Sequence, residues 1–406
     1  MACFCGKLML PWGLIDGCIE VVEDRISSIS IGMRGCEEAD LILPGMIDLH
    51  VHMRGLNQRH KGDWRSESLA ALSGGVTVVA DMPNNVPKID SREKLDMKTE
   101  EAKRESYVDF LLYTAFPYLD ERSYVIGIKI YPEDMYEDLN PVFKRASEMG
   151  KEVVVHAEDP LILKEAERVF DVKEHNRARP ELAEKIAVDR VIPLARRHGT
   201  KLRIAHSTLP YTLAAVSEAK AEGMEVKAEV TPHHLLYSPS DADSLGSLFK
   251  VNPPIRDTGE KLLGMVRAGF ADFLVTDHAP HSPEEKSKGY EEMPSGIPWL
   301  DALTPFLVQC VEEGKLPYRI LSMYSANPAL HLGLRRGSLV PGNLADLVIL
   351  KRERWTLKKE ELHTKARASP IEGKELKWKV SKVFIRGELA FHDGPVISEG
   401  FGVPAL

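Results

Sequence analysis

The chain has 406 residues and a mass of 45.4 kDa, enough for two or three ordinary domains or for one large α/β barrel with an accessory domain. Hydrophobic residues make up 43% of it and charged residues 28%, which is ordinary globular usage and excludes a wholly disordered chain. The 53 basic and 61 acidic residues are spread along the sequence and give a formal charge of −8, which argues against the basic surface of a nucleic-acid-binding protein.

The sequence predicts neither a membrane-spanning protein nor a secreted one. No apolar run reaches the ~18–20 residues that cross a bilayer, and Lys7 and Pro11 interrupt the segment where a signal peptide would need an apolar core. The five cysteines form no CxxC pair: Cys3, Cys5, Cys18 and Cys36 lie near the start, and Cys310 lies far away. This pattern predicts free thiols in a reducing cytoplasm.

Both ends of the chain have the pattern of short β-strands. Near the start, Cys18–Val22 and Ile26–Ile31 are short and rich in β-branched residues, and Asp346–Leu350 and Trp378–Ile385 repeat this pattern near the end. We therefore expect residues 1–43 and 338–406 to form one small composite β domain.

The middle of the chain, residues 44–337, alternates apolar strand-like runs with segments of helical period, such as Glu181–His198 and Tyr211–Gly223. Eight strand candidates are each followed by helix-compatible sequence: Ala39–His52, Val76–Met82, Val108–Phe116, Gly127–Tyr131, Glu152–Ala157, Lys201–Ser207, Glu225–His234 and Asp272–His278. The alternation predicts an α/β fold, a parallel (β/α)₈ TIM-like barrel.

Several of these runs end in metal-ligating residues, which buried strands usually avoid. His50 and His52 stand two residues apart and therefore project to the same side of a strand, while His156, His206 and Asp277 end three other runs. A single histidine at such a place is more often a hydrogen-bonded core residue than a ligand. The coincidence at four strand ends nevertheless favours a metal site, because zinc takes this set of nitrogen and oxygen ligands.

Lys129 stands between two isoleucines in the fourth run. Burial and nearby cations favour the neutral amine of a lysine, which can add carbon dioxide and become an anionic carbamate with one oxygen for each of two metals. The alternative is a lysine that reaches the rim of the barrel or pairs with Glu133.

Seven motifs in order, DLHVHMR, KIYPE, VVHAED, AHST, VTPHHL, KVNPPIRD and TDHAPHSPEEK, resemble those of the cyclic amidohydrolases, and most closely the dihydroorotases. The resemblance extends from Ile42 to Leu350 and implies a binuclear zinc site in a (β/α)₈ barrel with a β-rich side domain. It implies that His50, His52 and Asp277 hold one Zn²⁺, that His156 and His206 hold the other, and that N6-carboxylated Lys129 bridges the two.

The same resemblance implies the chemistry and the substrate contacts. A hydroxide between the metals would be the nucleophile and Asp277 the general acid and base, in the reversible cyclisation of N-carbamoyl-L-aspartate to (S)-dihydroorotate and water in pyrimidine (UMP) biosynthesis. Arg54 would clamp the substrate carboxylate, and the further contacts would be His52, Asn84, Asn252, His281, Ser295 and Gly296. Two departures from the family pattern, Gly55-Leu56-Asn57 and Trp299, put the loop geometry near the substrate in doubt.

Two other functions stay open at this point. Another cyclic amidase, such as an allantoinase or a hydantoinase (dihydropyrimidinase), would share every metal ligand but would not need Arg54. A catalytically inactive paralogue acting as a structural partner should have lost ligands, and none is missing. The expected partner is a small-molecule substrate, with no nucleic acid and no membrane; a homo-oligomer or an association with other pyrimidine-pathway enzymes is compatible with the sequence.

Overall fold

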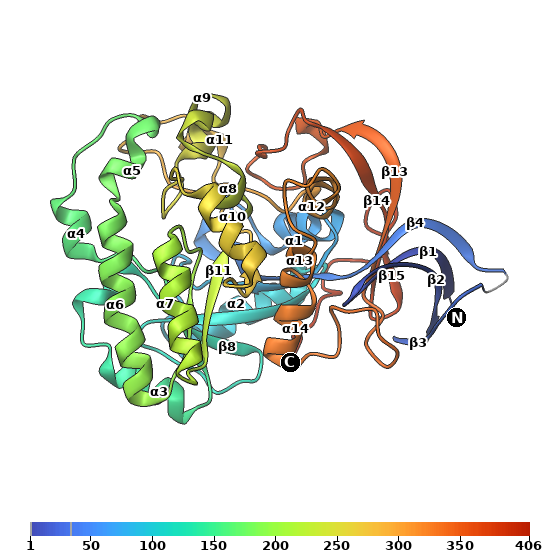
Figure 1. Cartoon of the computed structure of the whole chain (residues 1–406), viewed down its shortest axis with the longest axis horizontal. Coiled ribbons are helices and arrows are strands. Elements are labelled where there is room, and N and C mark those ends of the chain that lie inside the picture. The colour runs from blue at the N-terminus through green and yellow to red at the C-terminus, as the bar shows by residue number, and fades with distance from the viewer. Residues whose placement is uncertain (1, 33–34) are drawn as a thin grey trace.

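The computed structural model describes residues 2–32 and 35–406, and these form two sheets (Figure 1). One sheet is parallel, has eight strands and is surrounded by helices. The other is mixed, has seven strands and lies at the right of the view in Figure 1, where both the first and the last strands of the chain meet.

The parallel sheet confirms the predicted barrel. Its strands pair in chain order: β5 Met46–Val51, β6 Val76–Asp81, β7 Asp109–Ala115, β8 Val125–Ile130, β9 Glu152–Val155, β10 Lys201–Ile204, β11 Val226–Val230 and β12 Phe273–Leu274. The backbone N–H of His52 donates to the carbonyl of His278 over 2.8 Å, which joins the first strand to the segment after the last and closes the barrel. Strands β6, β7 and β8 are buried along their whole length, as continuous apolar runs in a parallel sheet should be.

Helices follow most barrel strands and cover the outside of the sheet. The longer ones are α1 Trp64–Ser73, α2 Arg92–Glu105, α3 Asn140–Glu148, α6 Glu181–His198, α7 Pro210–Ala221, α10 Gly259–Ala268 and α12 Leu303–Glu312. The shorter ones are α4 Pro160–Glu165, α5 His175–Ala178, α8 Pro232–Leu236, α9 Ala242–Leu245, α11 Pro283–Lys286, α13 Arg319–Met323 and α14 Ala326–Leu332. Helix α6 has the predicted bounds and ends at Gly199, whose φ of 64° is the left-handed conformation that glycine adopts without strain.

The mixed sheet joins the two ends of the chain, as predicted. Its strands are β1 Ala2–Leu10, β2 Gly13–Val22, β3 Arg25–Ser30, β4 Glu37–Pro44, β13 Leu347–Thr356, β14 Glu375–Ile385 and β15 Glu388–Phe391. Strand β4 lies between β1 and β13, so the N-terminal and C-terminal parts of the sheet meet there. Strand β1 was not predicted, because Lys7 and Gly6 interrupt its apolar pattern.

The predicted run Ala39–His52 is two strands in the structure, β4 in the mixed sheet and β5 in the barrel. Gly45 separates them at a point where the chain passes close to Thr77, and a Cβ at this position would lie 2.3 Å from the Thr77 hydroxyl. A glycine is therefore needed where the chain crosses from one sheet to the other.

The prediction of free thiols is wrong for four of the five cysteines. The structure joins Cys3 to Cys36 and Cys5 to Cys18 in disulfides, and only Cys310 is a free, buried thiol among the described residues. Sequence spacing could not show this, because the pairs form only once β1 lies between β2 and β4. The cysteine content therefore gives no argument for a reducing compartment.

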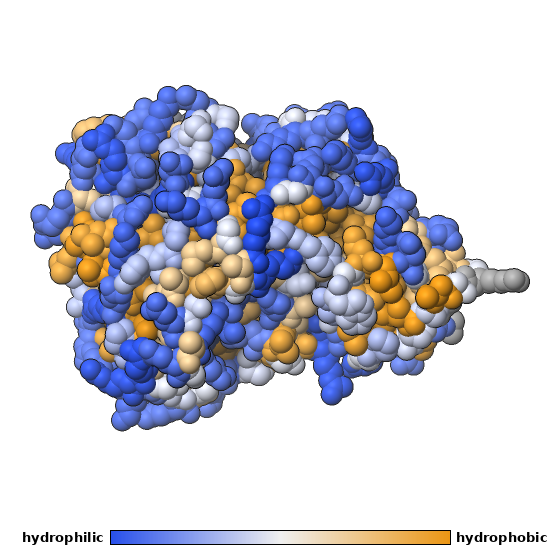
Figure 2. All heavy atoms as spheres, viewed as in Figure 1, coloured by the Kyte–Doolittle hydropathy of each residue, from blue (hydrophilic) through white to orange (hydrophobic). Residues whose placement is uncertain are grey.

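The surface is mainly polar. Figure 2 shows hydrophilic side chains over much of one face, with apolar side chains visible across its middle. Among the described residues, no helix combines the length and the apolar character needed to cross a bilayer.

Candidate active site

The C-terminal ends of the barrel strands surround a cavity of about 360 Å³. All twelve residues predicted for the site line it: His50, His52, Arg54, Asn84, Lys129, His156, His206, Asn252, Asp277, His281, Ser295 and Gly296. The strand ends on this side of a (β/α)₈ barrel are where catalytic groups gather. The structure therefore brings together residues that lie more than 240 positions apart in the chain.

His50, His52 and Asp277 form the first group of candidate ligands. The Nε2 atoms of His52 and His50 lie 3.0 Å and 3.4 Å from Asp277 Oδ1, and the burial of both imidazoles lowers their pKa values. Two donor atoms ~2.1 Å from one ion, at angles of ~90–110°, would be separated by about these distances. The arrangement therefore fits a divalent metal ion.

The hydrogen bonds of the other ring nitrogens of these histidines are compatible with a cation between the histidines and Asp277. His50 Nδ1 donates to Glu229 Oε2 over 2.8 Å, and His52 Nδ1 donates to Asn84 Oδ1 over 2.6 Å. In a neutral imidazole the proton is then on Nδ1, and the Nε2 lone pair faces the carboxylate oxygen of Asp277. A bound cation would turn this repulsion into coordination.

His156, His206 and Lys129 form the second group. The imidazole rings of His156 and His206 have centroids 4.5 Å apart, and His206 lies 5.1 Å from His50 of the first group. Lys129 Nζ and His206 Nδ1 are buried and have no hydrogen-bond partner among the described residues. Burial lowers the pKa of Lys129 to about 8, which makes its neutral amine accessible near neutral pH.

Two buried acidic side chains hold the ligands from outside the cavity. His156 Nε2 donates to Glu158 Oε2 over 2.6 Å, which leaves Nδ1 for a metal. Glu229, which orients His50, also lies 3.0 Å from Arg203 through its second oxygen. Carboxylates in this position fix the tautomer and orientation of a metal-ligating histidine.

Arg54 is a buried cation in the wall of the cavity. Its Nε donates to the carbonyl of Pro280 and its Nη2 to His281 Nε2, each over 3.1 Å. No carboxylate of residues 2–32 and 35–406 lies within 4 Å of its guanidinium, although buried arginines usually have such a partner. The cavity thus offers a positive group that lacks an anion.

Most of the remaining predicted substrate contacts lie next to one another along the cavity. His281 Nε2 lies 3.0 Å from the carbonyl of Ser295, and the Ser295 hydroxyl donates to Asn252 Oδ1 over 3.1 Å. Asn252 Oδ1 also accepts from His175 Nε2 over 2.9 Å. Asn84 lines the same cavity while its oxygen holds His52, so its role toward a substrate stays a prediction.

Sequence reasoning missed several residues of this site. Gln58, Lys61 and Tyr131 also line the cavity. Tyr131 could have been found, because it follows Lys129 by two residues and so shares its side of the strand. Glu229 could have been found as a charged residue inside an apolar strand run. Lys61 lies in a loop, where no periodicity marks it.

The two departures from the family pattern have structural explanations. Arg54, Gly55 and Leu56 all have positive φ, and the Leu56 backbone N–H donates to Glu101 Oε2 over 2.9 Å. A Cβ at Gly55 would lie 2.3 Å from that same carboxylate oxygen, so this turn is built around Glu101. Trp299 is fully buried, and its indole donates to His233 Nδ1 over 3.1 Å; it packs behind the site and does not line the cavity.

Comparison with known proteins identifies the family of the chain. The amidohydrolase family model matches residues 41–390. A dihydroorotase of Pyrococcus furiosus is 32% identical over 98% of this chain and 94% of its own length, and a dihydroorotase of Aeropyrum pernix is 35% identical over 93% and 91%. The solved L-hydantoinase (dihydropyrimidinase) of Arthrobacter aurescens has a TM-score of 0.90 at 23% identity, over 99% of this chain and 98% of that one, which shows the shared fold. The chain therefore belongs to the amidohydrolase family and, within it, to the dihydroorotases.

Proposed function

We propose that the protein catalyses the reversible cyclisation of N-carbamoyl-L-aspartate to (S)-dihydroorotate and water, in the cytoplasmic synthesis of pyrimidines. The observation that carries this proposal is Arg54, a buried guanidinium that has no carboxylate partner in the described part of the chain and lies in the same cavity as the candidate metal ligands. A planar guanidinium can bind the substrate carboxylate through two parallel hydrogen bonds. A hydantoin or allantoin ring has no carboxylate to offer it.

We further propose that two zinc ions occupy the cavity. His50, His52 and Asp277 would hold one, His156 and His206 the other, and a carbamate on Lys129 would bridge them. When bound, such ions supply a water molecule of lowered pKa as nucleophile and positive charge at the amide oxygen. The facing lone pairs of His52 and Asp277 and the unpartnered amine of Lys129 support this proposal.

Asp277 would move the proton. Its carboxyl is buried beside His50 and His52, and a cation held between these three side chains would keep it ionised. It would therefore be able to accept a proton from the attacking water. In ring opening the proton would then pass to the ring nitrogen as the bond between this nitrogen and the carbonyl carbon breaks, and ring closure would reverse these steps.

Arg54 and His281 would orient the substrate for this reaction. His281 accepts a hydrogen bond from Arg54 and contacts the backbone carbonyl of Ser295. It therefore connects Arg54 to the segment that contains Ser295. Holding the reacting groups in place in this way reduces the entropic cost of the reaction.

The test is an assay of the purified protein with carbamoyl aspartate, dihydroorotate, allantoin and hydantoin side by side. We expect turnover of the first two and little of the others. Preferential turnover of allantoin or hydantoin would overturn the proposal in favour of another cyclic amidase.

A further inference from the structure

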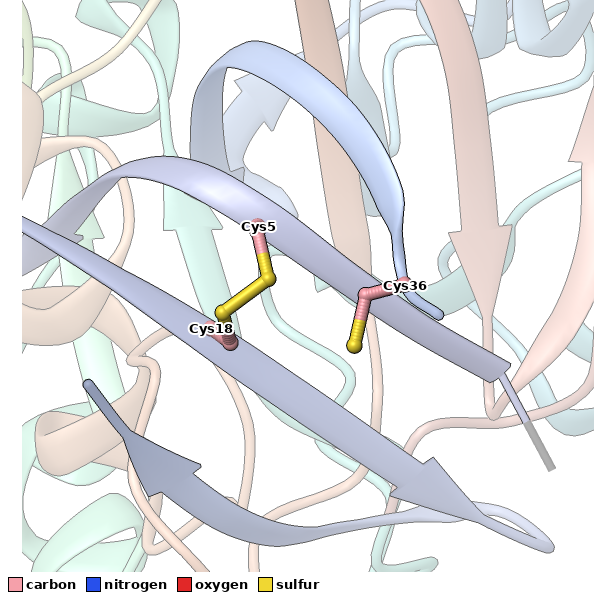
Figure 3. A group of neighbouring side chains, drawn as sticks. All are labelled: Cys5, Cys18 and Cys36. Atoms are coloured by element: carbon pink, nitrogen blue, oxygen red, sulfur yellow. A yellow bond between two sulfur atoms is a disulfide. The ribbon is translucent and has the colours of Figure 1, made fainter. Parts of the chain in front are cut away.

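Figure 3 shows Cys5, Cys18 and Cys36 close together on the mixed sheet, outside the barrel, and Cys3 is bonded to Cys36. The sulfurs of Cys5, Cys18 and Cys36 all lie within 4.8 Å of one another, although Cys36 is bonded to Cys3 and not to either of the other two. We name Cys3, Cys5, Cys18 and Cys36 the sulfur cluster. The two disulfides therefore lie side by side.

The register of the sheet produces this cluster. Cys3 and Cys5 are two residues apart in β1 and point to the same side. Cys5 stands directly opposite Cys18 of β2, with 4.0 Å between their Cα atoms, and Cys36 directly precedes β4 on the other side of β1. Strands β1 and β2 and the residue before β4 thus bring the two disulfides together.

Cys3 and Cys5 lie on a less buried side of β1 than Phe4 and Leu8. The alternate residues Phe4 and Leu8 are buried and pack in an apolar core with Ile19, whereas Cys3 and Cys5 are partly exposed. The sulfur cluster therefore occupies the side of the β1–β2 hairpin that the apolar core does not stabilise. Small β structures without enough apolar core are commonly held by disulfides or by a metal ion.

Two disulfides need two pairs of cysteines, but the two pairs can lie far apart. A single tetrahedral ion needs all four sulfurs close together, because with Zn–S bonds of ~2.3 Å the four sulfurs are ~3.8 Å apart. Sulfurs of both disulfides already lie within 4.8 Å, so small side-chain movements after reduction would suffice. A sulfur-only tetrahedral ligand set is typical of structural zinc.

We propose that the reduced sulfur cluster binds one zinc ion as a tetrathiolate site, separate from the metals of the barrel. A dithiol reductant would give two electrons and two protons to each disulfide and would itself become a disulfide. The four resulting thiols lose their protons as zinc binds. The same four sulfurs then form either the two disulfides or the zinc site. Both arrangements link β1 to β2 and to the start of β4. Because the ligands come together only in the folded sheet, the binding free energy of the ion stabilises that fold.

The test uses the full chain, reduced with a phosphine in the absence of air, freed of metal and titrated with Cd²⁺. Cadmium bound to thiolates has an ultraviolet charge-transfer absorption that imidazole and carboxylate ligands do not produce, so the barrel site does not contribute. We expect the amplitude of this absorption at saturation to correspond to one thiolate-bound Cd²⁺ per chain, however much Cd²⁺ the barrel takes up. Its absence from the reduced wild-type protein would overturn the proposal, whatever the behaviour of any variant.

Two variants identify the ligands. The double substitution Cys5→Ser, Cys18→Ser should abolish the absorption, whereas Cys310→Ser, which removes the remote cysteine, should leave it unchanged. An absorption that survives the double substitution would refute this ligand set. None of the four cysteines lines the catalytic cavity, so dihydroorotate turnover by the folded double variant reports on the proposed function separately.

Discussion

His50 Nδ1 lies 2.8 Å from Glu229 Oε2, and both side chains are shut off from solvent. Arg203 in turn lies 3.0 Å from the second oxygen of Glu229 and 2.7 Å from Glu152, so the orientation of a candidate metal ligand depends on a buried ionic network. The network reaches back from the cavity into the barrel. It explains why a charged residue stands inside the apolar strand β11.

Replacing Glu229 by glutamine removes the negative charge behind His50 and keeps the size of the side chain. We expect this variant to lose about 10- to 100-fold in metal affinity or activity, the usual cost of removing a partner that orients a metal ligand. Metal affinity measured by competition with a chelator, together with kcat, checks this. The matched control is Glu225→Gln, at an exposed position just before the same strand. Unchanged affinity and kcat in Glu229→Gln would show that this contact is only structural.

The metal content tests the two groups of ligands. We expect close to two ions per chain in the wild-type protein and a loss of activity in His50→Ala and His156→Ala, with the fold retained in both. His392→Ala, at an exposed position just after β15, should keep both ions. Full activity with no more than one ion per chain after dialysis would refute the binuclear site.

Lys129→Ala should lose the bridge and with it the second ion, and small carboxylic acids should restore part of the activity. In the metal-free protein burial lowers the pKa of Lys129 to about 8, and only the neutral amine adds carbon dioxide. The neutral fraction rises as pH increases through 8, so reconstitution with zinc at a fixed carbon dioxide concentration should be faster above this pH than below it. Reconstitution that needs no carbon dioxide, or two ions retained in Lys129→Ala, would argue against the carbamate.

Asp277→Asn tests the proton transfer. Asparagine has nearly the same shape but cannot accept the proton of water, so we expect the rate to fall at least ~10²-fold, as is usual for the loss of a general acid–base catalyst. Circular dichroism should show that the fold is kept. Turnover close to that of the wild-type protein would mean that the proton moves through another group.

The barrel and the site could be predicted from the sequence because both depend on local patterns. Apolar runs of strand length, each ending in His or Asp, are visible without a structure, and a parallel barrel necessarily brings such ends together. The six candidate metal ligands line one cavity for this reason, whereas the other six predicted residues of the cavity were expected only from the resemblance to the dihydroorotases.

Contacts that depend on how strands pair could not be predicted in the same way. The disulfides depend on β1 lying between β2 and β4, and the bond between His52 and Asn84 depends on the pairing of β5 with β6. Neither is encoded in the spacing of the residues concerned. The burial of Trp299 was missed for the same reason, since its partner His233 is 66 positions away.

The central claim is that Arg54 selects a substrate with a carboxylate, and Arg54→Met tests it most directly. Losing one partner of a buried, hydrogen-bonded charge pair costs about 2–5 kcal/mol. We therefore expect kcat/KM for dihydroorotate to fall roughly 30- to 5,000-fold. Metal content should stay the same, and any weak turnover of a neutral hydantoin should fall far less. Dihydroorotate turnover within a few-fold of the wild-type value would contradict the account.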